Sequence, residues 1–171
     1  MKKILILTSI YYPNPSANGI NTKYIVDELK KRNYDVTCLS VKENNEKSFE
    51  IIDDTQVYRV TPSNYSRILF NEASAKKNIA NKIYYKILHI LRKIKLGFLI
   101  FNFPNFDLMQ AKKVYNLITT LNNRKKFDCI IGVFQPFTNI AAITRFKKKN
   151  PDVLCGVYYL DLINSLPKPF F

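Results

Sequence analysis

Apolar and polar residues alternate in blocks along the chain, and each block predicts a strand or a helix. Residues 3–8 are almost all apolar, which is typical of a strand covered on both faces. Apolar residues at helical spacing follow over 20–32, and a second apolar run at 36–40 predicts another strand. A loop rich in Pro and Asn separates the first strand from the helix. This order of strand, helix and strand predicts a parallel β-α-β unit.

The same alternation continues to the end of the chain. A charged stretch, 42–54, is expected to be a loop. Further strands are predicted at 56–60, 129–134 and 153–160, and further helices at 72–94, 107–122 and 140–149. Right-handed crossovers arrange such elements as a doubly wound parallel sheet with helices on both faces. The sequence therefore predicts an α/β fold, Rossmann-like, in a single domain covering 1–171.

The first helix has a predicted apolar stripe and a predicted start. The stripe consists of Ile20, Tyr24, Ile25 and Leu29. Asn18 or Asn21 would cap the N-terminus of this helix. Basic residues at 30–32 suit its negative C-terminal end.

Composition narrows the class of protein. With 47% hydrophobic residues in 171, the chain has enough apolar side chains for a core, so a disordered chain is excluded. The net charge of +14 favours anionic partners: nucleic acid, anionic lipid or phosphorylated substrates. Cys38, Cys129 and Cys155 lie in apolar runs without a C-x-x-C pair, which indicates core thiols in a reducing cytoplasm. No metal site and no cofactor are predicted.

Candidate chemistry lies where the predicted strands end, because ligands of such sheets bind outside the carboxyl ends of the strands. The turn Asn18-Gly19-Ile20 would expose helix N–H groups to a phosphate or a hydroxyl, unless it is a plain connection. Gln135 and Asn139 would bind hydroxyls, or else cap the next helix and make loop hydrogen bonds. Asp161 would accept a hydrogen bond from a sugar hydroxyl or act as a base, or else cap the next helix or turn.

The predicted helix 72–94 is basic on one side and is followed by an aromatic segment. Its polar face carries Lys82, Lys86, Arg92 and Lys93, and the segment contains Phe98 and Phe101. These residues would face an anionic membrane surface. The alternative is an ordinary helix that packs its isoleucine stripe on the sheet and keeps its lysines in water.

Together, several of these pieces resemble the N-terminal half of GT-B-fold glycosyltransferases of the family 4-like group. The resemblance is carried by the strand at 4–9, Tyr12-Pro13, Asn18-Gly19-Ile20, the passage 29–36, Phe127-Asp128-Cys129-Ile130-Ile131 and Tyr159-Leu160-Asp161. Two features depart from the family pattern. Only one glycine, Gly19, stands in the first loop, and Leu160 stands where many members have a histidine, with Asp161 retained.

The resemblance implies a function and a missing partner domain. The chain would be the acceptor-binding half of a cytoplasmic enzyme, truncated before the C-terminal domain that binds the nucleotide-sugar donor, and inactive by itself. The acceptor would be a glycan or a lipid-linked sugar in cell-surface polysaccharide synthesis, with the enzyme peripheral at the inner face of the membrane. The alternative is a non-catalytic Rossmann-like module that binds nucleic acid through its basic face, and nucleic acid is the less favoured partner.

Overall fold

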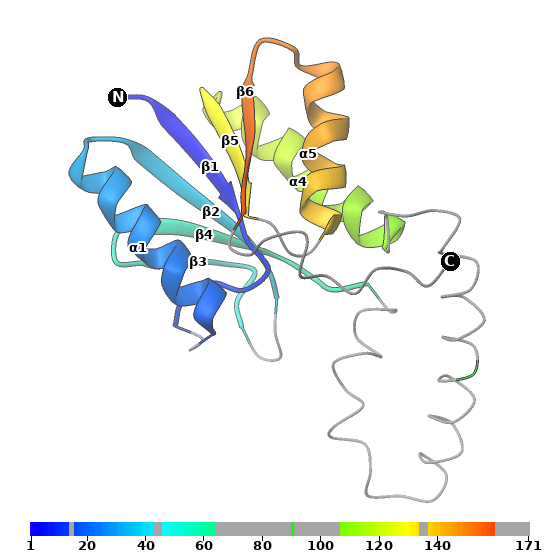
Figure 1. The fold of residues 1–171 in the computed structure, drawn as a ribbon, viewed down its shortest axis with the longest axis horizontal. Helices are drawn as coiled ribbons and strands as arrows, with labels where there is room; N and C mark the ends of the chain where they lie inside the picture. The colour runs from blue at the N-terminus through cyan, green and yellow to red at the C-terminus, as the bar shows by residue number, and fades with distance from the viewer. Residues whose placement is uncertain (14–15, 43–45, 64–89, 91–106, 134–136, 160–171) are drawn as a thin grey trace, which may run out of the picture.

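The computed structural model describes residues 1–13, 16–42, 46–63, 90, 107–133 and 137–159. Its strands are β1 (Lys3–Leu7), β2 (Asp35–Val41), β3 (Phe49–Ile52), β4 (Thr55–Val60), β5 (Cys129–Val133) and β6 (Leu154–Tyr158). Its helices are α1 (Ala17–Lys31), α4 (Leu108–Lys125) and α5 (Phe137–Lys149). The strands form one sheet in the order β3-β4-β2-β1-β5-β6 (Figure 1).

The sheet is parallel apart from its first edge strand. β1 pairs in parallel with β2 and β5, and β4 and β6 extend the parallel region on either side. Helix α1 covers one face of the sheet, and α4 and α5 cover the other (Figure 1). The predicted doubly wound α/β fold is therefore confirmed.

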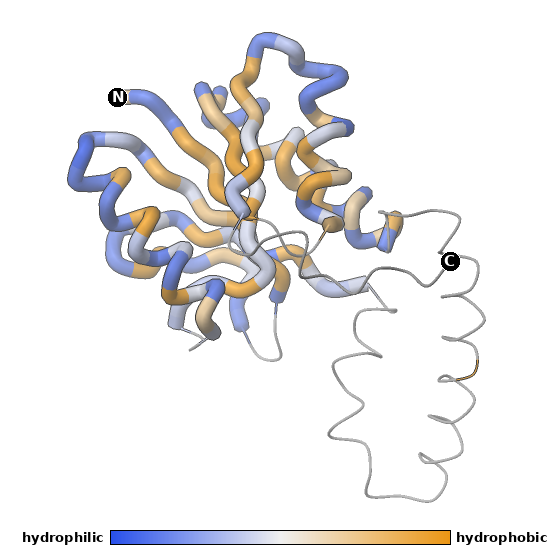
Figure 2. Tube along the Cα trace, in the orientation of Figure 1, coloured by the Kyte–Doolittle hydropathy of each residue, from blue (hydrophilic) through white to orange (hydrophobic). Residues whose placement is uncertain are grey.

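The central strand β1 is buried on both faces, as its apolar run predicts. Leu5 and Leu7 belong to the core beneath α4 and α5, whereas Ile4 and Ile6 belong to the core beneath α1. Side chains alternate across a strand, so an unbroken apolar run supplies both cores at once. Figure 2 shows that the central strands are hydrophobic along their length, whereas hydrophobic and hydrophilic residues alternate along the helices.

Helix α1 begins earlier than predicted and buries only part of the predicted stripe, because Ile25 and Leu29 pack against the core whereas Ile20 and Tyr24 do not. Its N-cap is Ser16, whose Oγ accepts a hydrogen bond from the Gly19 N–H at 3.0 Å, so the prediction of Asn18 or Asn21 as cap is wrong. Thr22 and Val26 are fully buried, whereas Ile20 and Tyr24 are 40% and 69% exposed. Thr22 Oγ1 donates to the Asn18 carbonyl at 2.7 Å, and this bond satisfies the hydroxyl inside the core.

The charged stretch 42–54 is not only a loop, because it contains β3. This strand runs antiparallel to β4 and is joined to it through Asp53 and Asp54, which both have positive φ. Consecutive positive φ values are typical of a tight hairpin turn. The buried guanidinium of Arg59 in β4 forms ion pairs with Glu46 and Glu50 and so fastens the hairpin to the sheet. The expected all-parallel sheet thus carries one antiparallel edge.

Helices α4 and α5 lie close to the ranges predicted for them from the sequence. α4 covers the predicted helix at 107–122 and continues to Lys125. α5 begins at Phe137 rather than at 140, so its first turn occupies residues expected to be a loop. Of the predicted helix 72–94 only Ile90 is described, and it is helical and 58% exposed. Within the described residues, no helix combines the length and apolar content needed to span a membrane.

Candidate functional site

The sheet reverses its winding beside β1, and this reversal defines the candidate site. From β1 the chain reaches β2 through α1 on one face, whereas α4 and α5 flank β5 on the other face (Figure 1). Leu7 of β1 pairs with Gly132 of β5, so the two strands end side by side. Ligands of open α/β sheets bind in the crevice outside such strand ends. We refer to this side of the sheet as the carboxyl edge, and to the opposite side as the amino edge.

The segment after β1 is held against the carboxyl edge by hydroxyl groups. The Thr8 N–H donates to the Leu39 carbonyl at 2.9 Å, and Thr8 Oγ1 donates to the Ile10 carbonyl at 3.1 Å. Thr22 Oγ1 lies 3.3 Å from Thr8 Oγ1, which links α1 to this turn. Tyr11 is 2% exposed and anchors the segment in the core, where burial raises the pKa of its phenol. The start of α1 is thereby fixed beside the end of β1.

The predicted turn Asn18-Gly19-Ile20 lies inside the first turn of α1 and is not a loop before it. Gly19 is buried and its φ is not positive, so no strained glycine turn is present there. Its N–H is occupied by the Ser16 hydroxyl. The first N–H groups of a helix have no intrahelical acceptor, and those of Ala17 and Asn18 lie at the positive end of the helix dipole. An anion or a sugar hydroxyl at the carboxyl edge would meet these two groups.

Asn139 lies in the first turn of α5, at the same edge. It is fully buried, and within the described residues neither its Nδ2 nor its Oδ1 has a hydrogen-bond partner. Asn139 is four residues before Ile143, so both side chains lie on the helix face that packs on the sheet. Gly132 lets this face approach closely, because a Cβ there would stand 2.5 Å from Ile143 Cδ1. Leaving a buried amide unpaired is costly, so Asn139 departs from the usual pairing of buried polar groups and is a candidate for ligand contact.

Sequence reasoning missed a third cluster at this edge, where β4 ends and α4 begins. Asp107 caps α4 by accepting the Gln110 N–H at 2.8 Å and also accepts a hydrogen bond from the Ser63 hydroxyl. Gln110 Oε1 in turn accepts the Ser63 N–H at 2.7 Å, whereas its Nε2 has no partner within the described part of the chain. The pattern Asp-x-x-Gln is a capping signal and could have revealed this cluster.

The other predicted site residues cannot be placed. Gln135 and Asp161 lie outside the described residues. So do the predicted membrane-facing residues Lys82, Lys86, Arg92, Lys93, Phe98 and Phe101. Among the residues that are described, no group of three His, Cys, Asp or Glu side chains is arranged to hold a metal ion.

The cysteines behave as core groups. Burial raises the pKa of Cys38 to about 12 and raises the pKa values of Cys129 and Cys155, so these thiols stay protonated at neutral pH. All three are free. A protonated thiol is a poor nucleophile, so these cysteines do not indicate thiol chemistry.

Comparison with known proteins assigns the general class. A family model described as "Glycosyl transferase 4-like" matches residues 14–100. The chain is similar in fold to sucrose-phosphate synthase from Thermosynechococcus elongatus, with a TM-score of 0.50 and 7% sequence identity. The similarity covers 93% of this chain and 32% of that protein, so the chain spans about a third of its length. No curated protein matches the chain.

Proposed function

This chain belongs to the glycosyl transferase 4-like family, and we propose that it is the acceptor-binding domain of a sugar-transferring enzyme. The enzyme would move a sugar from a nucleotide-sugar to a glycan or a lipid-linked acceptor. The observation that carries this proposal is the unpartnered amide of Asn139 beside the ends of β1 and β5. An amide offers two donors and one acceptor oxygen, which match a hydroxyl that both donates and accepts. Neighbouring hydroxyls on a sugar ring would satisfy both atoms of Asn139 once the side chains that cover this buried amide move aside.

The N-terminus of α1 would bind the negatively charged phosphate groups of the substrates. The N–H groups of Ala17 and Asn18 lie at a helix N-terminus, which attracts phosphate oxygens through its dipole. The predicted roles of Asn18, Gly19 and Ile20 are thus proposed to rest on the backbone of the helix and not on a flexible turn. The Ser16 side chain, by occupying the Gly19 N–H, leaves the earlier N–H groups available.

Catalysis is proposed to depend on positioning and on charge. The acceptor hydroxyl would be held in line with the donor sugar, and the leaving nucleotide would be stabilised as negative charge develops on it. We assign most donor binding to a second domain outside this chain. Gln135 and Asp161 remain proposed acceptor contacts, and Asp161 also the proposed base. The proposed setting is the cytoplasmic face of a membrane during synthesis of surface polysaccharide.

Titration of the isotopically labelled 171-residue chain with sugars tests the proposal. Glucose oligosaccharides and uridine diphosphate would be added separately, and amide shifts recorded by NMR. We expect shifts at the carboxyl edge, at Thr8, Ala17, Asn18 and Asn139, and none at the amino edge. Shifts confined to the amino edge, or to the outer surface of α1, would contradict the assignment of the site. The same chain should transfer no sugar, and robust turnover by it would refute the proposed need for a second domain.

A further inference from the structure

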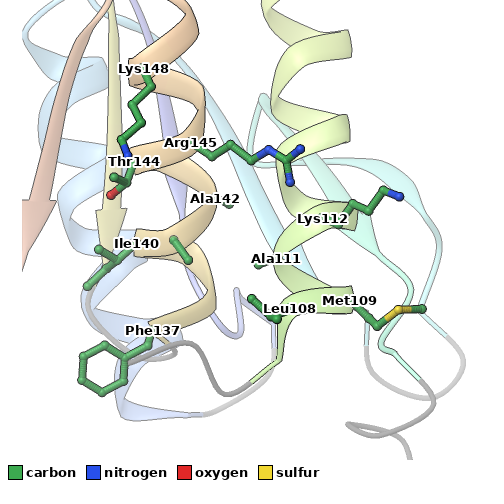
Figure 3. Close-up of a pocket in the computed structure, with 11 residues that line it drawn as sticks. Leu108, Met109, Ala111, Lys112, Phe137, Ile140, Ala142, Thr144, Arg145 and Lys148 are labelled. Atoms are coloured by element: carbon green, nitrogen blue, oxygen red, sulfur yellow. The ribbon is translucent and has the colours of Figure 1, made fainter. Parts of the chain in front are cut away.

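A groove of about 630 Å³ runs between α4 and α5 on the side of these helices away from the sheet (Figure 3). Parallel α/β topology places the N-termini of both helices at the carboxyl edge, so one end of the groove opens beside the candidate sugar site. The groove is separate from that site, because Asn139 is not among the residues that line it. Its two ends differ in chemistry.

The end nearest the carboxyl edge is apolar. It is lined by Leu108 and Met109 at the start of α4 and by Phe137 and Ile140 at the start of α5 (Figure 3). Leu108 is 59% exposed and Met109 is 69% exposed, so both project from the core into solvent. Adjacent large apolar side chains with this exposure are typical of an interaction surface.

The other end of the groove is basic. Lys112, Arg145 and Lys148 lie farther along the helices, away from Phe137 and Leu108 (Figure 3). No acidic residue is found among the described residues that line the groove. Arg145 lies over the Tyr115 ring at 4.9 Å, and Lys112 and Lys148 have no ion-pair partner among the described residues. Three cations next to an apolar surface complement an anionic amphiphile.

We propose that this groove docks the protein on an anionic phospholipid bilayer. Leu108 and Met109 would enter the boundary between headgroups and acyl chains, while Lys112, Arg145 and Lys148 would contact lipid phosphates. This orientation lays α4 and α5 along the membrane and holds the carboxyl edge beside its surface, where a lipid-linked acceptor would be presented. The biological purpose of the orientation rests on the proposed function, whereas the docking itself does not.

Co-sedimentation of the 171-residue chain with vesicles tests the docking. The vesicles would contain phosphatidylcholine with about one-third phosphatidylglycerol, and pure phosphatidylcholine vesicles would serve as the uncharged comparison. Each lysine near an anionic surface contributes about fivefold to binding, so Lys112→Gln with Lys148→Gln should weaken it roughly 25-fold. Lys2→Gln with Lys31→Gln removes the same charge from exposed positions away from the groove and should change binding less than twofold.

The contribution of the apolar side chains to vesicle binding is tested with a second pair of variants. Leu108→Gln with Met109→Gln should weaken vesicle binding about tenfold. Ile51→Gln with Leu154→Gln changes side chains of similar exposure, 63% and 64%, on the two edge strands and should have little effect. Circular dichroism should show all four variants folded, because every changed side chain is exposed.

Several results would overturn the docking proposal. Equal losses in the groove variants and their controls would mean that net charge alone attracts the vesicles. Tighter binding to a salt-matched oligonucleotide than to the vesicles would point to nucleic acid, and dimerisation abolished by Leu108→Gln with Met109→Gln would point to a second copy. The sugar titration, made without vesicles, stays an independent readout. Sugar shifts at the carboxyl edge without vesicle binding would remove the docking proposal alone.

Discussion

The two edges of the sheet differ in how completely their buried polar side chains are paired. At the amino edge, the buried Asn122 Oδ1 accepts the Phe127 N–H at 3.0 Å, and the exposed Asp128 Oδ2 accepts the Lys3 N–H at 2.7 Å. At the carboxyl edge, Asn139 and the Nε2 of Gln110 have no partner within the described residues. The remaining buried side-chain atoms without a hydrogen bond in the described part belong to Ser40 and Arg59, near the carboxyl ends of β2 and β4.

We propose that the difference separates polar groups that hold the fold from polar groups that contact a ligand. Polar groups that serve only the fold are expected to be paired, because an unpaired buried group costs about 1–3 kcal/mol. The amino edge follows this rule and ties α4, β1, β2 and β5 together. The carboxyl edge departs from it at the place where ligands of such sheets bind. The predictions below test this division, beginning with the largest expected effect.

Phe146→Ala should have the largest effect on folding. Phe146 is fully buried in the core beneath α5, in the half of the helix nearest the amino edge. Truncating a buried phenylalanine removes apolar contacts and leaves a cavity, which costs about 3–5 kcal/mol. Urea denaturation measures the loss. A loss below about 1 kcal/mol would contradict the packing of α5 described above.

Raising the pH above 9 should lower the free energy of unfolding through the buried thiol of Cys38. Burial raises the pKa of Cys38 from 9.0 to about 12, and the protonated thiol is the form that the fold accepts. Below pH 9 the thiol is protonated in both states, and the stability is at its full value. As the pH rises from 9 toward 12, only the unfolded chain ionises, so stability falls by at most about 1.4 kcal/mol per pH unit. Because tyrosines add to this slope, Cys38→Ala is the control, and an identical slope in that variant would refute the assignment.

Asn122→Ala should destabilise the amino edge. Asn122 is 6% exposed, and its loss leaves the buried N–H of Phe127 without an acceptor. The expected cost is about 1–3 kcal/mol, measured by urea denaturation. An unchanged stability would mean that the paired groups at this edge do not hold the fold.

Lys125→Met should have a smaller effect at the same edge. Lys125 Nζ lies 3.2 Å from Asp35 Oδ1 and donates to Thr37 Oγ1 at 3.0 Å, but its side chain is 24% exposed. Partly exposed ion pairs contribute about 0.2–1 kcal/mol, and salt screens them. Thermal unfolding at low and high salt measures the effect, and the difference between wild type and variant should shrink at high salt. A salt-independent difference would assign the loss to packing of the lysine chain.

Most of the fold could be predicted from the sequence because burial shapes the hydrophobic pattern directly. The run at 3–8 predicts a strand covered on two faces, and Leu5 and Ile6 are buried in opposite cores. The errors occur where polar residues are buried or apolar residues exposed. Thr22 replaces Ile20 in the buried face of α1 because its hydroxyl bonds to the helix backbone. β3 was missed because Glu50 pairs with Arg59 of β4, a contact between residues that are not adjacent in sequence.

The sequence predicted that Asn139 lies at the carboxyl edge, but it did not predict what surrounds Asn139 there. Asn139 follows an apolar strand, which is sufficient to place it at the carboxyl edge. Its position inside α5 depends on the helix beginning at Phe137, and its lack of partners depends on what surrounds it in three dimensions. The cluster of Ser63, Asp107 and Gln110 joins residues more than forty positions apart, and only its capping signal is visible in the sequence.

The measurement that tests the central claim most directly is a joint one on Asn139→Ala: its free energy of unfolding and its sugar titration by NMR. The variant removes two buried polar atoms that the fold does not pair and that cost about 1–3 kcal/mol, so stability should not fall and should rise by up to that amount, in contrast to Asn122→Ala. Sugar-induced shifts at Thr8 and Ala17 should disappear. A loss of stability equal to that of Asn122→Ala, with the sugar shifts intact, would show that Asn139 serves the fold and would contradict the account.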